Sequence, residues 1–449
     1  MSGNRQVAAT TGKGTAVSNI YQSKATNTSP TPAMPDEVLV SLDQIAESAK
    51  EGLLALAVGA GMQVMYAMMD ADVAALVGPK GKHVPDRAAV RHGHEDGSVT
   101  LGGRRVPVRR PRVRAADGGG EVRLPCYELF SSTEVLGRMA LERMLAGLST
   151  RRYGHGLEPV GEQVAATASA TSRSAVSRRF VAATEHALAQ LMAADLSGLD
   201  LVAVMVDGVG FAEHLCVVAL GIGIDGTKHP LALVEGSTEN ATLVRDLLVG
   251  LRERGLDVAR PILAVLDGST ALSRAVREVF DKPIIQRCQE HKIRNVRDRL
   301  PEKLRSLVQQ RMRQAYHADS ALAAEAKLTA LAAELDKTHP GAAASLREGL
   351  QETLTVLRLG VPPTLARTLR STNPIESMIS ICRNHSTNVK RWRDGQMTLR
   401  WCAAGMVEAT TQFRRVNGHL HLPKLRAALE RHFRETVTPV SHNQNKTAA

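Results

Sequence analysis

Hydrophobic and polar positions change their period several times along the chain. Residues 1–35 contain almost no large apolar side chain, so they cannot bury enough surface to offset the entropy of ordering, and we expect a disordered tail. From about Leu42 to Leu76 the chain is apolar and rich in Ala, which is typical of a helix. Residues 98–128 alternate Val with Arg and are broken by Gly and Pro, which predicts a short β-ribbon.

Two further helices are predicted between residues 131 and 197. Either Thr171 or Ser172 is placed to cap the start of the second helix. Apolar residues recur on one face of that helix, as expected when the face packs on a core. These residues are Val176, Phe180, Leu188 and Leu191.

Beyond residue 198 the pattern becomes that of a sheet. Three apolar runs of strand length, at 199–207, 214–224 and 229–236, are separated by Asp-Gly and Gly turns, which predicts an antiparallel meander. Two more strands, at 261–267 and 283–288, alternate with helices. Three antiparallel strands followed by alternating helix and strand indicate an α/β core with ribonuclease H-like order.

A wholly helical pattern at 300–365 interrupts this alternation, and the core resumes with a helix in the segment TNPIESMISICR. We therefore expect an α/β ribonuclease H-like catalytic core with a helical insertion, preceded by a mainly helical DNA-binding region. The predicted divisions are 1–35 (disordered tail), 36–130 (helical region with a basic β-ribbon), 131–197 (helix-turn-helix-like DNA-binding region), 198–299 (first part of the catalytic core), 300–365 (helical insertion), 366–435 (last core helix and C-terminal helices) and 436–449 (loose tail).

The composition of the chain indicates what kind of partner it binds. A chain of 449 residues suggests two to four domains. Its formal net charge of +12 points to a polyanion, with nucleic acid as the first candidate. The cysteines have no paired spacing, which argues against a disulfide framework. We expect no apolar run to reach the roughly 18 residues of a membrane span, and the first residues lack the apolar stretch of a signal peptide, so we expect a soluble cytoplasmic protein.

Basic and polar residues mark three candidate DNA-contact segments. Arginines would line one face of the β-ribbon, although a charged edge strand has the same pattern. The helix that starts near residue 173 resembles the second helix of a helix-turn-helix, whose first turns enter the major groove, although a plain amphipathic helix with a basic start is the alternative. A basic stretch follows the last core helix. The candidate contacts are Arg104, Arg105, Arg109, Arg110, Arg173, Ser174, Ser177, Arg178, Lys390 and Arg391.

Three acids fall at the ends of predicted core elements. Asp207 ends the first strand, Asp267 ends the fourth, and Glu376 lies in the first turn of the last core helix. Two-metal phosphoryl transfer needs hard oxygen ligands from separate elements, able to hold two Mg²⁺ ions about 4 Å apart. Aspartates at the carboxyl ends of two strands also lie at the edge where α/β sheets bind ligands.

Each acid has a structural alternative. Asp207 with its following glycine is a common hairpin-turn pair. Asp267 is a candidate N-cap of the helix behind it. Glu376 would complete a capping arrangement with Asn373 at the N-cap and Pro374 at the first helical position. The joint placement of the acids, rather than any one residue, favours the metal-binding interpretation.

Cys288 and His291 form a C-x-x-H pair. A structural zinc site needs four ligands, and no second pair lies nearby in the sequence. Positions i and i+3 share a face of a helix, so the pair is expected to face the active site together, beside Arg287 and Lys292. The alternative is one buried Cys and one surface His.

Four segments together resemble the Mutator-like bacterial insertion-sequence transposases. They are the Asp-Gly pairs that begin at Asp207 and Asp267, the C-x-x-H pair, and the segment STNPIES with Glu376. The match spans roughly residues 130–415, with a long helical gap between the last two acids. The combination of TN-x-IES with an upstream C-x-x-H is specific.

The resemblance implies that Asp207, Asp267 and Glu376 are the catalytic and metal-binding triad of a DNA transposase, supported by Cys288 and His291. It implies Mg²⁺ as the cofactor, with Mn²⁺ as a substitute. The implied partners are double-stranded DNA, as terminal inverted repeats and as target. Because two DNA ends must be held together, we expect a homodimer or a larger assembly, in the cytoplasm at the nucleoid.

Two other functions would account for part of the sequence pattern. A DNA-binding regulator descended from a transposase would keep the DNA-binding helices and lose the acids, and the presence of all three acids argues against it. A ribonuclease H-like nuclease would cut DNA without joining it. An assay of strand transfer separates that alternative from a transposase.

Overall fold

A computed structural model describes residues 52–82, 87–236 and 240–437. The tail predicted at 1–35, the first part of the helix predicted from Leu42 and most of the tail predicted at 436–449 lie outside the described residues. The chain divides into two compact units. Unit 1 runs to Ser132 and includes Pro159–Ser169, and unit 2 consists of Thr133–Glu158 and of the chain from Ala170 onward.

In unit 1 a long helix packs on an antiparallel sheet. Strands β1 (Ala89–Leu101) and β2 (Arg104–Ala115) form a hairpin, to which the short strand β3 (Glu121–Val122) adds. Gly102 and Gly103 join the hairpin with positive φ at both positions, as a tight two-residue turn requires. The helices of this unit are α2 (Leu53–Val77), α3 (Pro125–Ser131) and α5 (Glu162–Thr167). The predicted ribbon therefore exists, but it starts earlier than expected and its last residues are helical.

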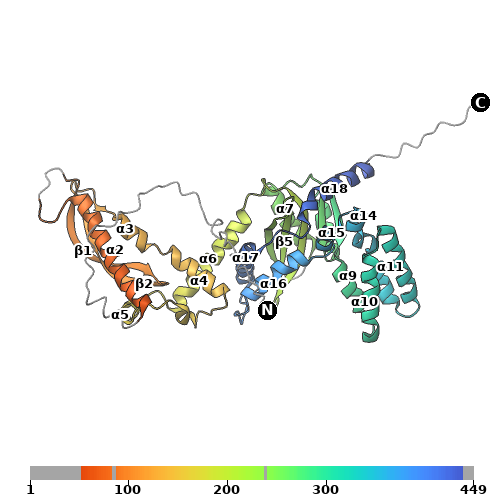
Figure 1. Ribbon diagram of the computed structural model, residues 1–449, viewed down its shortest axis with the longest axis horizontal. Coiled ribbons are helices and arrows are strands. Elements are labelled where there is room, and N and C mark those ends of the chain that lie inside the picture. The colour runs from red at the N-terminus through yellow and green to blue at the C-terminus, as the bar shows by residue number, and fades with distance from the viewer. Residues whose placement is uncertain (1–51, 83–86, 237–239, 438–449) are drawn as a thin grey trace, which may run out of the picture. The chain divides into compact units, whose positions relative to one another are not determined.

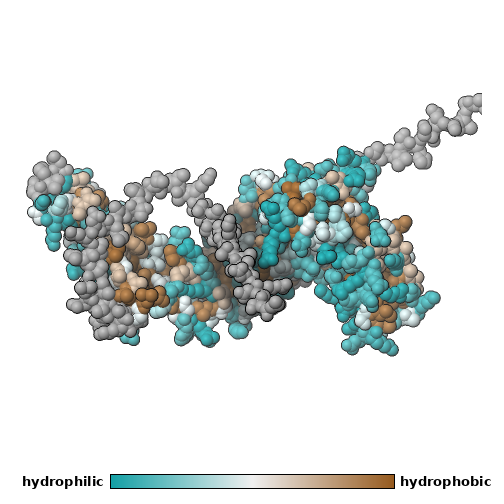
Figure 2. Space-filling view, viewed as in Figure 1, coloured by the Kyte–Doolittle hydropathy of each residue, from teal (hydrophilic) through white to brown (hydrophobic). Residues whose placement is uncertain are grey.

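Helix α2 corrects one sequence expectation. By length and composition alone it is apolar enough to cross a membrane, although we expected no run of that kind. A single such helix is a weak indication, because helices of soluble proteins pass the same test. Asp72, inside α2, accepts a hydrogen bond of 2.8 Å from the backbone N–H of Cys126 in α3. Leu53 and Leu54 are exposed, and Figure 2 shows hydrophobic side chains on the surface of this unit.

Unit 2 is built on a five-stranded mixed sheet in the order β6-β5-β4-β7-β8. Strands β4 (Leu201–Phe211), β5 (His214–Gly223) and β6 (Lys228–Gly236) form an antiparallel meander. Strands β7 (Ile262–Leu266) and β8 (Pro283–Arg287) continue the sheet in parallel to β4. The predicted meander and both later strands are confirmed.

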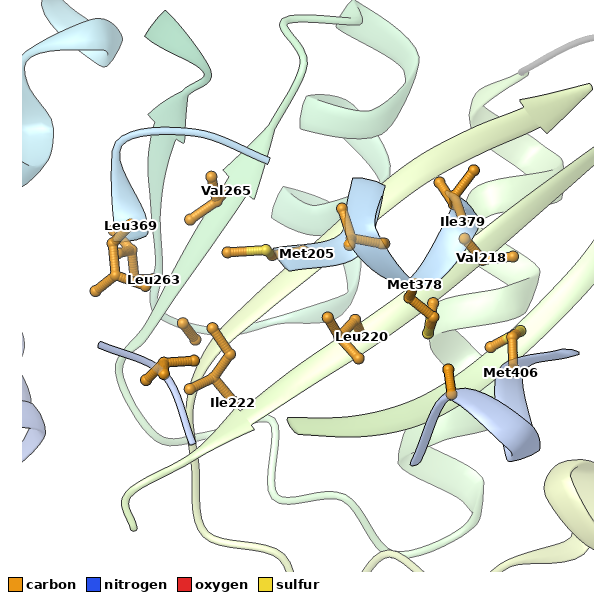
Figure 3. Close-up of a cluster of buried hydrophobic side chains, with 14 of the residues drawn as sticks. Met205, Val218, Leu220, Ile222, Leu263, Val265, Leu369, Met378, Ile379 and Met406 are labelled. Carbon is orange, nitrogen blue, oxygen red and sulfur yellow. The ribbon is translucent and has the colours of Figure 1, made fainter. Parts of the chain in front are cut away.

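Helices cover both faces of this sheet, which is why every residue of β7 is buried (Figure 1). Helices α7 (Ala241–Glu253) and α8 (Thr270–Val279) pack on one face. The other face is covered mainly by C-terminal helices, and Figure 3 shows Met378, Ile379 and Met406 packed against strand residues such as Met205. These helices are α16 (Asn373–His385), α17 (Gly395–Gln412) and, after the short η2 (His419–His421), α18 (Leu422–Val437).

The segment between β8 and α16 is helical, as predicted, and most of it has a hydrophobic core of its own. Met312, Leu328 and Leu346 lie in that core and are buried. Its helices are α9 (Gln289–Arg297), α10 (Glu302–Tyr316), α11 (Ala321–Asp336), α12 (Pro340–Arg347), α13 (Leu350–Thr353), α14 (Thr355–Arg358) and α15 (Pro363–Leu369).

The boundary predicted between residues 197 and 198 is wrong. Helices α4 (Glu134–Leu145) and α6 (Arg173–Ala193) belong to unit 2, together with the turn η1 (Tyr153–Gly156). The ring centroid of Phe180 in α6 lies 4.5 Å from that of Trp401 in α17, so the apolar face predicted for α6 packs on the sheet-bearing unit. Residues 146–172 separate α4 from α6, so the pair lacks the short turn of a helix-turn-helix.

Candidate active site

Asp207 lies inside strand β4 rather than at its end. It pairs with Val218 of β5, and the strand continues to Phe211, so the predicted strand end and the hairpin-turn alternative are both wrong. The parallel pairing of β4 with β7 nevertheless ends at Val206 and Leu266. Asp207 and Asp267 therefore follow two adjacent, paired positions of neighbouring strands.

All three acids lie on the same side of the sheet, the side that α16 covers. Side chains alternate along a strand, and Met205 and Val209 of β4 both pack on that face, so Asp207 between them shares it. On β7 the same alternation places Val265 on that face, two residues before Asp267. Glu376 lies in the first turn of α16, the helix that packs there.

Electrostatic interactions connect the three carboxylates. The pKa of Asp207 is raised to about 7, mainly by burial, and the negative charges of Asp267 and Glu376 contribute to the rise. Two interactions oppose this rise: the backbone N–H of Gly208 donates to Asp207 Oδ1 at 2.9 Å, and His291 contributes positive charge. Asp207 is thus a desolvated carboxylate next to two other acids, an arrangement that favours a cation.

Asp267 does not cap the helix that follows it. The N-cap of α8 is Ser269, whose hydroxyl accepts from the backbone N–H of Leu272 at 3.5 Å. Asp267 Oδ1 accepts from the backbone N–H of Ser269 at 2.7 Å. This bond orients one oxygen of the carboxylate, and the N-cap alternative for Asp267 is wrong.

Glu376 does not cap its helix either. Helix α16 begins at Asn373, and the side chain of its N-cap residue, Thr372, makes no capping hydrogen bond. Glu376 Oε1 accepts from the hydroxyl of Thr372 at 2.8 Å. The predicted arrangement with Asn373 at the N-cap is wrong by one residue, and the Glu376 carboxylate is not occupied by the backbone.

The C-x-x-H pair lies beside Glu376. Cys288 precedes α9, is buried, and donates its backbone N–H to the carbonyl of Leu266 at 2.7 Å. His291 Nε2 lies 3.7 Å from Glu376 Oε1. The hydrogen bond with Cys288 raises the pKa of His291, and the charges of Asp207 and Glu376 act in the same direction against the effect of burial. The expected orientation of the pair toward the acids matches this geometry, while its role stays a prediction.

Arg287 and Lys292 do not share this orientation, contrary to our expectation. Both are buried and interact with Glu348, which follows α12 in the helical insertion. Lys292 Nζ also donates to the carbonyl of Ser345 at 2.7 Å. Arg287, at the end of β8, and Lys292, on α9, both face the insertion, whose Glu348 supplies the carboxylate that each contacts.

Thr372 is a site residue that the sequence analysis missed. It is fully buried, and its hydroxyl contacts Glu376, His291 and Cys288. The available signal was its place within the segment STNPIES itself. Neither hydrophobic periodicity nor charge distinguishes Thr372 from a threonine at the start of an ordinary helix.

The arginines of the β-ribbon are only partly available to a ligand. Arg105 donates to Ser98, Thr100 and the carbonyl of Ser131. Arg110 forms ion pairs with Glu95 and Glu121. Arg109 is exposed, whereas Arg104 is half-buried and donates to the carbonyl of Gly102. A continuous basic face is therefore not present on this hairpin.

The other candidate contact residues are exposed. Ser172 caps α6 by accepting from the backbone N–H of Ala175 at 3.3 Å, as predicted. The four candidates in the first turns of α6 point to solvent: Arg173, Ser174, Ser177 and Arg178. Lys390 and Arg391 are exposed between α16 and α17, next to Trp392, whose ring centroid lies 4.9 Å from that of Phe211 at the end of β4.

The three carboxylates are suitable ligands for a divalent cation, although in this structure they are not close enough to one another to coordinate a single ion. Within the described ranges, no three His, Cys, Asp or Glu side chains are gathered closely enough to coordinate one ion. The three carboxylates offer hard oxygen atoms, which Mg²⁺ prefers over sulfur and imidazole ligands. Their crowding at a buried position would be relieved by positive charge between them.

Comparisons with known proteins cover most of the chain. The family described as "Transposase, Mutator family" matches residues 34–416. The transposase for insertion sequence element ISRM5 of Rhizobium meliloti (strain 1021) is 27% identical over 370 residues, which are 81% of this chain and 90% of that relative. The transposase for insertion sequence element IS6120 of Mycolicibacterium smegmatis is 33% identical over 242 residues, 51% of this chain and 73% of that relative.

Proposed function

Because the chain belongs to the Mutator family of transposases, we propose that it cleaves and joins DNA strands with Asp207, Asp267 and Glu376 as its catalytic acids. The observation that carries the proposal is the placement of these carboxylates, from β4, the end of β7 and α16, on one face of the sheet. Asp207 is half-buried there among like charges. None of the three caps a helix, and the backbone N–H groups of Gly208 and Ser269 occupy only one oxygen of Asp207 and of Asp267, so each acid keeps an oxygen for chemistry.

The proposed fold class of the core is ribonuclease H-like. The sheet order β6-β5-β4-β7-β8, with an antiparallel meander followed by two parallel strands, supports it. Two aspartates from adjacent strands then provide a rigid base for a reacting phosphate, while Glu376 is brought in by a helix. The helical insertion separates the segments that carry Asp267 and Glu376 in the sequence, but both acids lie on the same face of the sheet.

The carboxylates would hold Mg²⁺, for which Mn²⁺ is the expected substitute because it accepts similar oxygen ligands. When bound, such ions activate the attacking oxygen and stabilise charge on the leaving oxygen. Asp207 and Asp267 would bind from the sheet, and Glu376 from the helix. The Ser269 N–H holds one oxygen of Asp267 and the Gly208 N–H one of Asp207, which limits how far each carboxylate turns.

DNA is the proposed substrate, as terminal inverted repeats and as target. The exposed first turns of α6 and the segment with Lys390 and Arg391 are the candidate contact surfaces, and both belong to unit 2. We propose a homodimer or larger assembly because two DNA ends must be joined. Light scattering with and without end DNA tests this, and a single protein on a single end that completes strand transfer would contradict it.

The experiment that tests the activity is cleavage and strand transfer of a labelled terminal-repeat duplex. Asp207→Asn, Asp267→Asn and Glu376→Gln keep the size of each side chain and remove one charge. Each should abolish both reactions in Mg²⁺ and Mn²⁺ while end binding persists. A wild-type protein that binds ends without cutting would indicate a regulator, and one that cuts without joining would indicate a nuclease.

A further inference from the structure

The hydroxyl of Thr372 lies at the centre of the contacts that join the C-x-x-H pair to Glu376. Its Oγ1 lies 2.8 Å from Glu376 Oε1, 3.3 Å from His291 Nδ1 and 3.4 Å from Cys288 Sγ. Thr372 is fully buried, so no solvent competes for these contacts. Its backbone N–H also donates to Cys288 Sγ at 3.4 Å, which fixes the start of α16 against the start of α9.

One hydroxyl carries one proton, and this decides the direction of each hydrogen bond. A carboxylate accepts only, and the contact to Glu376 is the shortest of the three, so the proton of Thr372 goes to Glu376 Oε1. The lone pairs of Oγ1 are then left to accept, and His291 must donate to them from Nδ1. A neutral His291 would therefore direct the lone pair of Nε2 toward Glu376 Oε1, 3.7 Å away.

From this geometry we propose that Thr372 is a positioning residue that holds the Glu376 carboxylate, and with it His291, in the orientation in which Glu376 binds a divalent cation. The proposal rests on the proposed function, since it assumes that Glu376 is a metal ligand. Glu376 is half-exposed, with 38% of its side chain accessible, and lies near the start of its helix. Without a fixed donor beside it the carboxylate would sample several rotamers, and Thr372 removes that freedom.

The same contact explains why a threonine occupies this place. Valine has the same shape without a hydroxyl and would leave Glu376 and His291 without their shared partner. Serine keeps the hydroxyl and removes only a methyl group. The pair Thr372→Val and Thr372→Ser therefore separates hydrogen bonding from packing.

Metal binding by full-length protein without DNA is the first readout. The rise in melting temperature is measured as Mn²⁺ or Mg²⁺ is added, and its half-saturation gives an apparent affinity. We expect Thr372→Val to weaken that affinity by about 10- to 100-fold and Thr372→Ser to restore most of it. Thr398→Val is the matched control: Thr398 is also fully buried, but its hydroxyl donates only to a carbonyl of its own helix, that of Asp394.

Cleavage of end DNA at increasing Mn²⁺ is the second readout. Thr372→Val should need more metal to reach its maximal rate, whereas Thr398→Val should follow the wild type. Equal metal affinity in Thr372→Val and wild type would overturn the proposal, as would equal loss in the Val and Ser variants. If wild type binds metal but never cleaves DNA, the proposed function fails while the metal titration still decides the role of Thr372.

Discussion

The guanidinium group of Arg287 occupies the space beside Gly268 that a side chain would need. A Cβ atom at Gly268 would lie 2.1 Å from Arg287 Nε. Gly268 also has a φ of +110°, a conformation that other residues rarely adopt. Two features therefore require a glycine after Asp267: the backbone conformation at the end of β7, and the arginine side chain packed against it. The geometry of Asp267 consequently depends on Arg287.

Gly268→Ala should lower both stability and activity. The strained backbone and the clash with Arg287 together should cost about 2 kcal/mol or more, and relief of the clash would move Asp267. Chemical unfolding and end cleavage measure the two effects. Gly250→Ala is the control, because Gly250 lies in helix α7 with open space around it, and alanine there should be neutral or slightly stabilising. A Gly268→Ala protein with wild-type stability would contradict the steric account.

The buried Lys292 should give the protein a distinct pH dependence. Burial, and then the charge of Arg287, lower its pKa from 10.5 to about 8. The unfolded chain therefore binds more protons than the folded one between these values, and the free energy of unfolding should rise with pH from about 8 to 10. Urea unfolding across that range measures the slope. In Lys292→Met the rise should be smaller, and equal slopes would mean that Lys292 does not titrate there.

Arg173 and Arg178 should contribute to DNA binding through direct contact. Both are exposed at the start of α6. Replacing either with Ala should weaken end binding by roughly 1–3 kcal/mol if it contacts a base, or reduce the salt dependence by about one counterion if it contacts a phosphate. Arg431→Ala, an exposed arginine of α18, is the control with the same charge change. Identical binding isotherms for Arg173→Ala, Arg178→Ala and this control would exclude α6.

This binding test needs the full chain. A fragment ending near residue 195 would lack α17 and would expose Phe180, which packs on Trp401 of that helix. Arg110→Ala would also be a poor probe of DNA contact. Arg110 pairs with Glu95 and Glu121 across the hairpin, so its loss would act on the fold of unit 1.

Hydrophobic periodicity predicted the sheet of unit 2 well. All five strands, the helical insertion and the last core helix lie where the pattern placed them, because each buries a continuous apolar face. Strand ends were harder to predict. Asp207 was expected to end β4, but antiparallel pairing with β5 carries the strand on to Phe211, and pairing between strands is not visible in one strand's sequence.

The candidate site was predicted from its acids and only in part from its surroundings. Carboxylates at predicted element ends were a sufficient signal for Asp267 and Glu376. Thr372 was missed, and Arg287 and Lys292 were misplaced, because their contacts are with residues far away in the sequence. Thr372 contacts His291, and both basic residues contact Glu348 of the helical insertion. The affiliation of α6 with unit 2 depends likewise on a tertiary contact, that of Phe180 with Trp401.

Asp207→Asn should make the metal-free protein more stable while it abolishes cleavage. Asp207 is half-buried near Asp267 and Glu376, and its pKa of about 7 means that the folded protein disfavours its charge at and above neutral pH. Asparagine has nearly the same shape and removes the charge. At about pH 8 we expect the free energy of unfolding to rise by about 1 kcal/mol, since a shift of one pKa unit corresponds to about 1.4 kcal/mol and relaxation of the site reduces the gain.

Asp225→Asn is the matched control for this prediction, and it should shift stability in the opposite direction. Asp225 lies in the exposed turn between β5 and β6, where Thr227 donates to it from its hydroxyl and its backbone, and these bonds lower its pKa. Removing that charge should therefore destabilise the protein slightly and leave cleavage intact. If Asp207→Asn is also destabilising without metal, the crowding of carboxylates that supports a cation site at this edge of the sheet is absent in solution. A stable but inactive Asp207→Asn protein would indicate instead that the buried charge is retained for chemistry at a cost to the fold.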